Sequence, residues 1–591
     1  MVATAPEQPL PPDATWRKAW AMLTRGQRSE ALFLVACMMF GAILETLGIG
    51  AVVPALIVMS SEEALRSFPA AALLVDRLGR PSHATLIVAG LLLLLGIYAF
   101  KSLYLLWLAW RQSRFLTNVQ RSVTQRLFDT YLAQPWSFHL QRNSADLVRN
   151  VTTEMGVFSN ALVSIMMAGI DVMMLVSVAG LLVFVQPVGA MLVVATLGVS
   201  TWVLQRYTRS LLTRMGRVRL DQSALRAIHL TQGLGGIKEI KVRSAEPAFS
   251  RRFRQHDDAM MRAVHRQMFL VNIPRLWFEM VAVAVICLLA LTMLLQGISP
   301  DVFVPTLGLF AAAAFRILPS VNRLTLAFQA FRYCGPSIET LHAELALPRV
   351  AVGGVSERLQ FREGLQLDGV SFAYPGTSDL VLRDVSLRIP RGSAVGFIGE
   401  SGAGKSTLVD VLLGLLEPTA GRVLADGQDI ARAPGSWQNI VGYVPQSIYL
   451  CDDSLRRNVA FGLDPAEIDD EAVRRAIRAA QLDDFVATLP EGLETVVGER
   501  GVRLSGGQRQ RIGIARALYH DPDVLVLDEA TSALDADTER GVMEAVDSLH
   551  GAKTLIIVAH RLGTVANCDV IHRMRGGRIV TSGSLEEVTA S

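Results

Sequence analysis

The sequence predicts an all-α membrane domain of six helices, followed by an α/β domain. Six apolar runs, each long enough to cross a hydrocarbon layer about 30 Å thick, all lie before residue 331. Beyond residue 361 the chain is mixed in polarity, and an apolar strand pattern, Val395–Ile398, runs directly into a glycine-rich loop. Strand, glycine loop and helix in that order are typical of a phosphate-binding α/β fold.

The apolar runs give the expected limits of the membrane helices. They cover about 31–59, 84–110, 161–185, 188–204, 277–295 and 302–330. Only Gln186 and Pro187 separate the third run from the fourth, and proline there suits a tight hairpin. We therefore expect a transmembrane domain over 1–344 whose helices extend into the cytoplasm, a linker over 345–360 and a second domain over 361–591.

The distribution of basic residues predicts the orientation. Arginine and lysine are concentrated in Arg111–Arg149 and Arg206–Arg275, whereas the connection Gln296–Asp301 has none. Basic segments stay on the cytoplasmic side, so the chain is predicted to be a multi-pass protein of the inner (cytoplasmic) membrane with its second domain in the cytoplasm. The first basic segment has apolar residues at four-residue spacing, typical of a membrane helix that continues into the cytosol: Val119, Val123, Leu127 and Tyr131.

The composition argues against several classes of protein. A net charge of +3 is too small to indicate a nucleic-acid partner. The five cysteines lack the paired spacing of a metal site or a disulfide framework. The segment Met1–Asp13 lacks the order of a cleavable signal peptide, so the first apolar run is expected to stay as a membrane anchor.

Four motifs follow one another in the second domain. They are GESGAGKST at Gly399–Thr407, LSGGQ at Leu504–Gln508, LVLDEATSALD at Leu525–Asp535, and His560. A glycine-rich phosphate loop alone occurs in many unrelated nucleotide-binding proteins. The ordered set is far more specific, and it predicts an ATP-driven motor.

The chemistry of the loop explains its residue types. Lys405 is expected to hold the terminal phosphates of ATP and Ser406 to ligate Mg²⁺, with Thr407 beside them. The helix that opens at Lys405 directs its positive end at the same charge. Three glycines let backbone N–H groups turn towards phosphate oxygens: Gly399, Gly402 and Gly404.

Two adjacent carboxylates end the apolar strand Val524–Leu527. This placement puts Asp528 at the metal ion and Glu529 beside the water that attacks the γ-phosphate. Because Glu529 is present, each site is expected to be competent for hydrolysis.

These residues resemble the ATP-binding cassette (ABC) transporter family, and the resemblance covers essentially the whole chain. It implies that Tyr374 stacks on adenine, that Gln446 senses Mg²⁺ and the transported load, and that His560 contacts the γ-phosphate, with Lys405 and Glu529 as the other catalytic residues. It further implies an exporter-type half-transporter, most simply a homodimer, in which one chain's signature closes on the ATP held by its partner. The signature residues are Ser505, Gly506, Gly507 and Gln508.

Simpler interpretations remain for single motifs. LSGGQ alone is equally typical of a helix N-cap with a flexible glycine pair, and Tyr374 of an ordinary turn aromatic. By the same resemblance, Pro135–Asn143 and Gly233–Val242 fall where exporters place the short helices that couple motor to membrane, the second on the partner's motor. The alternative is that both segments are solvated turns.

The substrate prediction depends on charged residues within or beside the apolar runs, where charge is costly without a partner or water: Glu45, Lys101, Asp171, Arg275, Glu279, Arg316 and Arg323. Arg316 lies roughly 20 Å from the outer end of its helix, too deep for a surface anchor. If Lys101, Arg275 and Arg316 face one cavity, a dimer doubles them into a basic ring suited to phosphate or pyrophosphate. Alternatively, Lys101 snorkels, Arg275 reflects the positive-inside bias, and Arg316 pairs with Glu45, Asp171 or Glu279.

A narrower resemblance favours the basic ring. ETLGIGAVVPAL at Glu45–Leu56, IPRLWFE at Ile273–Glu279 and FRILPSVNR at Phe315–Arg323 look like the ABC flippases of lipid-linked oligosaccharides. On this resemblance the substrate is a polyprenyl-pyrophosphate-linked oligosaccharide, moved by alternating access at the expense of ATP. Lys101 stands where arginine is the expected residue, and lysine lacks the bidentate fork. A general lipid or hydrophobic drug exporter is the alternative, and a peptide exporter fits less well.

Overall fold

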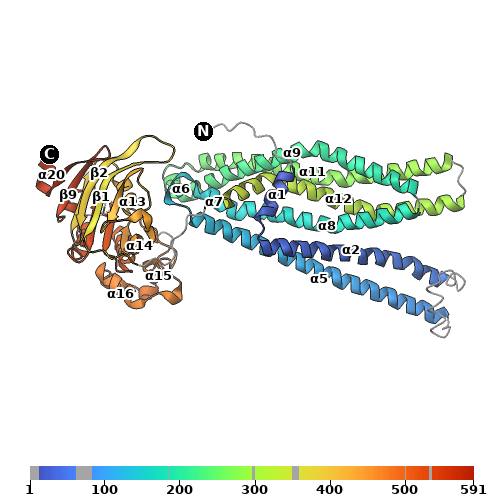
Figure 1. Ribbon diagram of the computed structural model, residues 1–591, viewed down its shortest axis with the longest axis horizontal. Helices are drawn as coiled ribbons and strands as arrows, with labels where there is room; N and C mark the ends of the chain where they lie inside the picture. Colours follow the sequence, from blue (N-terminus) through green and yellow to red (C-terminus); the bar gives the residue numbers. More distant parts are fainter. Residues whose placement is uncertain are drawn as a thin grey trace. The chain divides into compact units, whose positions relative to one another are not determined.

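The chain folds into two compact units, one helical and one α/β, and the predicted fold class is confirmed (Figure 1). The structure is a computed structural model that describes residues 12–60, 83–185, 187–295, 300–348, 358–498, 501–531 and 536–590. The helical unit comprises Met1–Leu132 and Arg142–Arg349, and the α/β unit comprises Ala133–Gln141 and Val350–Ser591. A short stretch between two long helices therefore belongs to the α/β unit.

Long helices build the helical unit. Its shorter elements are α1 (Pro12–Met22), α7 (Ser144–Arg149), a π-helical turn η1 (Asn150–Glu154) and α10 (Ile237–Val242). Helices α2 and α5 run side by side, and α12 packs against α8, α9 and α11. The long helices are α2 (Arg25–Ser60), α5 (His83–Leu132), α8 (Met155–Val185), α9 (Pro187–Gly235), α11 (Glu246–Leu295) and α12 (Pro300–Leu345).

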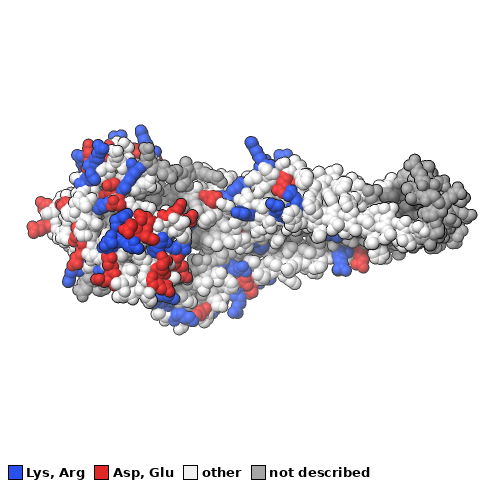
Figure 2. All heavy atoms as spheres, turned by 90° about the horizontal axis from the view of Figure 1, so that it is seen from below, with Lys and Arg blue, Asp and Glu red and all other residues white. Residues whose placement is uncertain are grey.

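Five helices in the described part of the chain are long and apolar enough to cross a membrane. The stretches that meet this criterion are Arg25–Leu44, Ile87–Leu132, Ser144–Gly180, Gly189–Gly235 and Glu246–Leu295. The sixth predicted span, 302–330, falls in α12, where several side chains lie outside the described residues. The face of the helical unit that Figure 2 shows carries clusters of charged side chains over part of its length, and its described residues are otherwise mostly uncharged, as expected of a protein that spans a bilayer.

A buried ion pair joins three helices of the helical unit. Arg219 of α9 donates to both carboxylate oxygens of Glu154, at 3.2 Å and 2.6 Å, and both side chains are at most 4% exposed. Ser337 of α12 accepts from Arg219 at 2.7 Å and donates to Glu154 at 2.6 Å. Because charges without solvent need such partners, this network fixes η1, α9 and α12 to one another.

Two sheets form the α/β unit. The smaller is antiparallel, in the order β2-β1-β4-β5, with β1 (Gly364–Ala373), β2 (Leu380–Pro390), β4 (Ala420–Ala425) and β5 (Gln428–Asp429). The larger has the order β10-β9-β3-β8-β7-β6 and is parallel except for the β9–β10 pair. Its strands are β3 (Ala394–Gly399), β6 (Val441–Val444), β7 (Val524–Asp528), β8 (Thr554–Val558), β9 (Val570–Arg575) and β10 (Arg578–Gly583).

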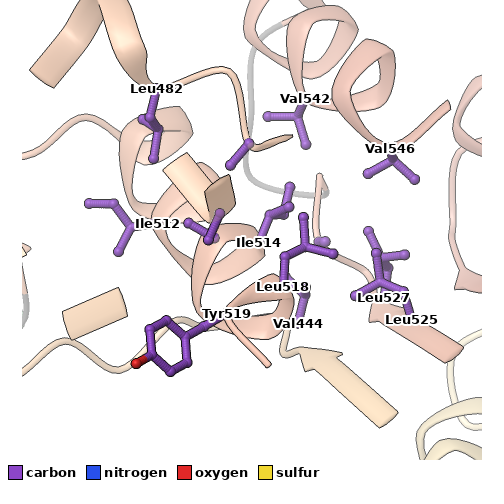
Figure 3. Packing of buried hydrophobic residues seen from close by; sticks show 14 of the residues in the cluster. Val444, Leu482, Ile512, Ile514, Leu518, Tyr519, Leu525, Leu527, Val542 and Val546 are labelled. Atoms are coloured by element: carbon purple, nitrogen blue, oxygen red, sulfur yellow. The ribbon is translucent and has the colours of Figure 1, made fainter. Parts of the chain in front are cut away.

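Helices cover the larger sheet and bury its central strands. Every residue of β7 and β8 is buried, which explains their continuous apolar sequence. Figure 3 shows Leu525 and Leu527 of β7 packed with residues of α18 and α19, including Ile514 and Val542. The helices of this unit are α6 (Trp136–Gln141), α13 (Lys405–Leu412), α14 (Pro434–Gln438), α15 (Leu455–Val459), α16 (Asp470–Ala479), α17 (Asp483–Thr488), α18 (Gly506–Leu518), α19 (Ala536–Asp547) and α20 (Leu585–Ala590).

The buried ion pair predicts an unequal response to single and double substitution. Arg219→Met leaves the Glu154 carboxylate buried without a counter-charge, so stability should fall by about 3–5 kcal/mol. Replacing both partners, as Glu154→Gln with Arg219→Met, should restore much of the loss. The measurement is the thermal midpoint of the detergent-purified protein. Arg226→Met serves as the control, because its pair with Asp257 is about one-third exposed and should contribute less than about 1 kcal/mol. Equal shifts for Arg219→Met and Arg226→Met would contradict the role of burial.

Candidate active site

The phosphate loop connects β3 to α13 with the geometry that its glycines permit. Gly402 and Gly404 have φ of 82° and 99°, in the left-handed region that side chains rarely adopt. A Cβ added to Gly404, the N-cap of α13, would lie 3.0 Å from the carbonyl oxygen of Val381. Lys405 is buried, and its ammonium donates to the carbonyl oxygens of Gly399 at 2.9 Å and Glu400 at 3.2 Å. The lysine charge is thus held against the loop that the sequence predicted to cradle phosphate.

The topology of the larger sheet brings the other predicted residues to the same place. Strands β3, β8, β7 and β6 are parallel neighbours, so their carboxyl ends share one edge. The phosphate loop follows β3, Gln446 follows β6, Glu529 follows β7 and His560 follows β8. Residues that are up to 161 positions apart in the sequence therefore meet at one sheet edge.

Glu529 is the centre of this group. One carboxylate oxygen accepts from the Gln446 amide at 2.7 Å, and the other lies 2.9 Å from Nε2 of His560. The Lys405 ammonium is 3.4 Å from the same histidine nitrogen. Glu529 also has a φ of 47°, which is unusual for a side-chain-bearing residue, and its backbone N–H donates to Val558 at 2.9 Å. Backbone and side-chain contacts together therefore fix the orientation of the Glu529 carboxylate.

Asp528 has the properties of a cation ligand. It is 8% exposed, and its Oδ1 atom has no hydrogen-bond partner among the residues described. Burial and the charges of Glu529 and Asp410 raise the pKa of Asp528 to about 6, while Lys405 acts in the opposite direction. A divalent cation would favour the ionised form and satisfy the free oxygen, so the residues present fit Mg²⁺. Asp528 with Ser406 and Gln446 would hold it, and the ion would neutralise phosphate charge there.

Tyr374 and Thr407 contact each other. The Tyr374 hydroxyl lies 3.1 Å from Oγ1 of Thr407, and its ring meets Phe372 edge to face at 5.1 Å. The hydrogen bond ties the end of β1 to the first turn of α13. The predicted stacking on adenine stays a prediction.

The signature motif forms a helix N-terminus. Ser505 is the N-cap of α18: its hydroxyl accepts from the Gln508 backbone N–H at 3.2 Å, and the Gln508 side chain accepts from the Ser505 N–H at 2.8 Å. The N-cap interpretation of LSGGQ is therefore correct as a description of the free chain. Within the described residues, no hydrogen bond joins Ser505–Gln508 to the phosphate loop of the same chain.

Comparison with known proteins gives a consistent result. Residues 382–532 match the family model described as ABC transporter, and residues 30–316 match that described as ABC transporter transmembrane region. An ATP-dependent lipid A-core flippase of Methylococcus capsulatus is 33% identical over 86% of this chain and 84% of its own length. The chain belongs to the ABC transporter family. Its ATPase domain couples ATP hydrolysis to transport.

Other similar proteins extend over the same range. The flippase of the same name from Cupriavidus metallidurans is 32% identical over 86% of this chain and 85% of its own length, and that of Ralstonia nicotianae is 29% identical over 100% and 97%. Among solved structures, a bacterial Atm1-family ABC exporter with ATP bound superposes with a TM-score of 0.78, covering 95% of this chain and 96% of that one, at 24% identity. This last similarity concerns the fold.

Two residues near the ATP site of this ABC transporter were missed from the sequence. Asp410 of α13 lies close enough to raise the pKa of Asp528, and the Trp136 indole of α6 lies close enough to Asp410 to oppose the rise that burial causes in the pKa of Asp410. Trp136 lies in Pro135–Asn143, the first segment predicted to couple motor to membrane, and α6 packs as part of the ATPase unit. No local signal pairs positions 136 and 410, because their contact exists only in the folded unit.

The predicted substrate residues lie on three different helices. Lys101 of α5 is half-buried, with its ammonium 5.2 Å from the centre of the Tyr98 ring, and Arg275 of α11 is exposed. Arg316 lies in α12, but its side chain is outside the described residues. The basic ring therefore stays a prediction.

Asp171, one of the three carboxylates considered as a partner for Arg316, pairs with another arginine. Asp171 of α8 is paired with Arg323 of α12, which donates to it through Nε at 2.9 Å and through Nη2 at 2.5 Å. The carboxylate is 4% exposed, so this bidentate pair satisfies the charge that the sequence left without an assigned partner.

The position of Glu529 predicts a separation of binding from turnover. Glu529→Gln keeps the side-chain shape but removes the base, so ATP hydrolysis should fall by at least about 100-fold while ATP binding persists. Hydrolysis by the purified protein and equilibrium binding of labelled ATP measure the two effects. Glu544→Gln is the matched control, because it makes the same substitution at an exposed glutamate of α19. It should leave ATP hydrolysis and ATP binding unchanged. Wild-type hydrolysis by the Glu529 variant would remove the catalytic assignment.

The proximity of Trp136 to Asp410 predicts how α6 is held. Trp136→Phe keeps an aromatic ring but removes the indole N–H that faces the Asp410 carboxyl. Because Trp136 is 41% exposed, the loss should be about 1 kcal/mol, and amide hydrogen exchange in α6 should become about fivefold faster. Trp202→Phe, which alters an exposed tryptophan of α9, should leave that exchange rate unchanged. Equal exchange in wild type and the Trp136 variant would contradict a stabilising contact between Trp136 and Asp410.

Proposed function

We propose that this ABC transporter flips an amphipathic lipid with an anionic head group across the cytoplasmic membrane. The observation that carries the proposal is similarity over about 85% or more of the chain to proteins named ATP-dependent lipid A-core flippases. The similarity includes the membrane region as well as the motor, so it bears on the cargo as well as on the energy source.

The finer substrate proposal is a polyprenyl-pyrophosphate-linked oligosaccharide. Lys101, Arg275 and Arg316 support it, because basic side chains in apolar helices are costly unless they meet an anion or water. Arginine binds phosphate oxygens in pairs, whereas lysine offers a point charge. In a homodimer the three residues occur twice, which would give six positive charges for a pyrophosphate head.

The dimer is supported by the separation of the two halves of the ATP site. The phosphate loop and the signature lie on one chain without a hydrogen bond between them in the described residues. Two chains arranged head to tail would place Ser505, Gly506 and Gly507 of one against the ATP held by the other. ATP binding would then close the motors and turn an inward-open cavity outward, and hydrolysis would reset it.

The roles of the remaining residues follow from their positions. Lys405 would hold the terminal phosphates, Asp528 would face Mg²⁺ and Glu529 would orient the attacking water, with His560 beside the γ-phosphate. Gln446 bonds to Glu529, so it would report the state of the metal site to the catalytic carboxylate. The orientation inferred from charge would put the ATPase domain on the cytoplasmic side of the membrane.

The test is reconstitution of the purified protein in vesicles, with ATP-dependent flipping measured for two substrates, a polyprenyl-pyrophosphate glycan and a lipid A-core molecule. Wild type should flip at least one of them, and Arg316→Ala should lower the rate about 10-fold or more, because one charge-assisted contact is lost at each of two sites. Arg254→Ala, an exposed arginine on the basic part of α11, is the control.

The possible outcomes test three statements separately: that the protein flips lipids, that the lipid is a polyprenyl carrier, and that a basic ring binds its head group. Flipping of the lipid A-core molecule alone would support lipid flipping and refute the polyprenyl carrier. Equal rates for Arg316→Ala and Arg254→Ala would refute the basic ring. Absence of flipping of either substrate, with stimulation of ATP hydrolysis by uncharged hydrophobic compounds, would favour the general exporter.

A further inference from the structure

A second basic site lies away from the predicted substrate residues. A cavity of about 420 Å³ is lined by α1, α9 and α12, and among the described residues neither Lys101 nor Arg275 lines it. At about 30 Å³ for each water molecule, this volume holds roughly fourteen waters. The cavity is therefore large enough for a phosphate group together with part of the molecule that carries it.

The lining of the cavity is strongly cationic. Four arginines contribute to it, Arg206, Arg209 and Arg217 from α9 and Arg332 from α12, against one carboxylate, Glu339. The three α9 arginines are spaced by three, eight and eleven positions, so they lie along one face of that helix. Ser210 and Thr213 lie on the same face and add hydroxyl groups.

Three of these arginines, Arg206, Arg209 and Arg332, form no ion pair in the described part of the chain. Arg217 differs from them, because it lies 4.0 Å from Glu339 and its charge also acts on the Asp221 carboxyl. Arg332 donates to the backbone carbonyl oxygen of Gln205 at 3.2 Å, a contact that carries no full charge. Burial and the charge of Arg209 both lower the pKa of Arg332, and no carboxylate within ion-pair distance of Arg206 or Arg209 occurs in the described part of the chain. Clustered guanidinium groups repel one another, and an anion between them would relieve that repulsion.

The cavity lies at the expected level of lipid head groups. Arg206 comes two residues after Leu204, where the apolar run of α9 ends, a rise of about 3 Å. On α1, Trp16 and Trp20 stack at 6.4 Å, and Trp16 meets Phe331 of α12 at 5.8 Å. Tryptophan is enriched at the boundary between membrane and water. The aromatic pair thus marks the boundary beside the cavity.

We propose that this cavity binds a phosphate-bearing anion, supplied either by an anionic phospholipid of the surrounding leaflet or by free phosphate. Basic pockets between membrane helices on the cytoplasmic side are suited to phosphorylated head groups. Arginine forks bind phosphate oxygens in pairs. The occupant would bridge α9 and α12 through Arg209 and Arg332. This site is separate from the transported substrate, and it does not depend on which lipid the transporter flips.

The test measures binding to the full-length purified protein by native mass spectrometry. The probes are dioctanoyl phosphatidylglycerol, dioctanoyl phosphatidylcholine and inorganic phosphate. Phosphatidylglycerol should bind wild type about 10-fold more tightly than Arg209→Ala/Arg332→Ala, because two charge-assisted contacts are lost. Arg214→Ala removes an exposed arginine of the same helix that does not line the cavity, and it should change the affinity by less than about twofold.

A variant that is expected to bind the lipid more tightly separates the electrostatic effect from damage to the fold, because damage would weaken binding. Glu339→Gln removes the one carboxylate of the lining, so phosphatidylglycerol should bind more tightly by about threefold. Arg209→Lys/Arg332→Lys keeps both charges and should retain part of the affinity that the alanine variant loses. Weaker or unchanged binding by Glu339→Gln would count against an electrostatic site.

The probes distinguish the two sources of phosphate. Tight binding of phosphatidylglycerol with weak binding of inorganic phosphate supports the lipid, and displacement of the lipid by inorganic phosphate supports the free anion. Equal binding of phosphatidylcholine and phosphatidylglycerol, or equal effects of the Arg209/Arg332 and Arg214 alanine variants, would overturn the proposal. The assay involves no transport, so its failure leaves the proposed flipping activity untouched.

Discussion

The shared edge of the parallel sheet is the constraint on which the ATP site depends. Because β3, β8, β7 and β6 are parallel neighbours, four loops that are distant in sequence leave the sheet on one side. The central strands β7 and β8 are entirely buried, so the sheet cannot shift to move one loop without the others. Glu529 shows the result: its carboxylate meets Gln446 from one neighbouring strand and His560 from the other.

The helical unit contains two arrangements of charged side chains, namely buried ion pairs and a cluster of arginines between α9 and α12. The carboxylates Glu154 and Asp171 are both nearly inaccessible, and each is matched by an arginine that donates at least two hydrogen bonds to it. These pairs connect α9 and α12 to the segment that contains η1 and α8. The arginines between α9 and α12, in contrast, outnumber the carboxylate that they face. The first arrangement stabilises helix packing at neutral net charge, and the second leaves a positive surface available to an external anion.

The short helix α6 belongs to the α/β unit although it lies between two helices of the helical unit in the sequence. Trp136 of α6 lies near Asp410 on α13, the same helix whose first turn carries Lys405 and Ser406. The segment predicted to couple motor to membrane is therefore close to the helix that follows the phosphate loop.

The sequence alone determined the order of the two domains and indicated the candidate residues of the phosphate loop, because both depend on local patterns. Apolar runs report the membrane helices, and Gly402, Gly404 and Lys405 are required by the geometry of one short loop. It also indicated that Asp171 needs a partner, because an isolated charge among apolar residues is costly.

Only the tertiary structure decided which residues meet. Arg323 pairs with Asp171 because the packing of α8 against α12 sets which turns of the two helices face each other. The same holds for Trp136 with Asp410 and for Arg209 with Arg332, which are far apart in the sequence. Sequence periodicity specifies the face of a helix, whereas contacts between helices depend on packing of the whole fold.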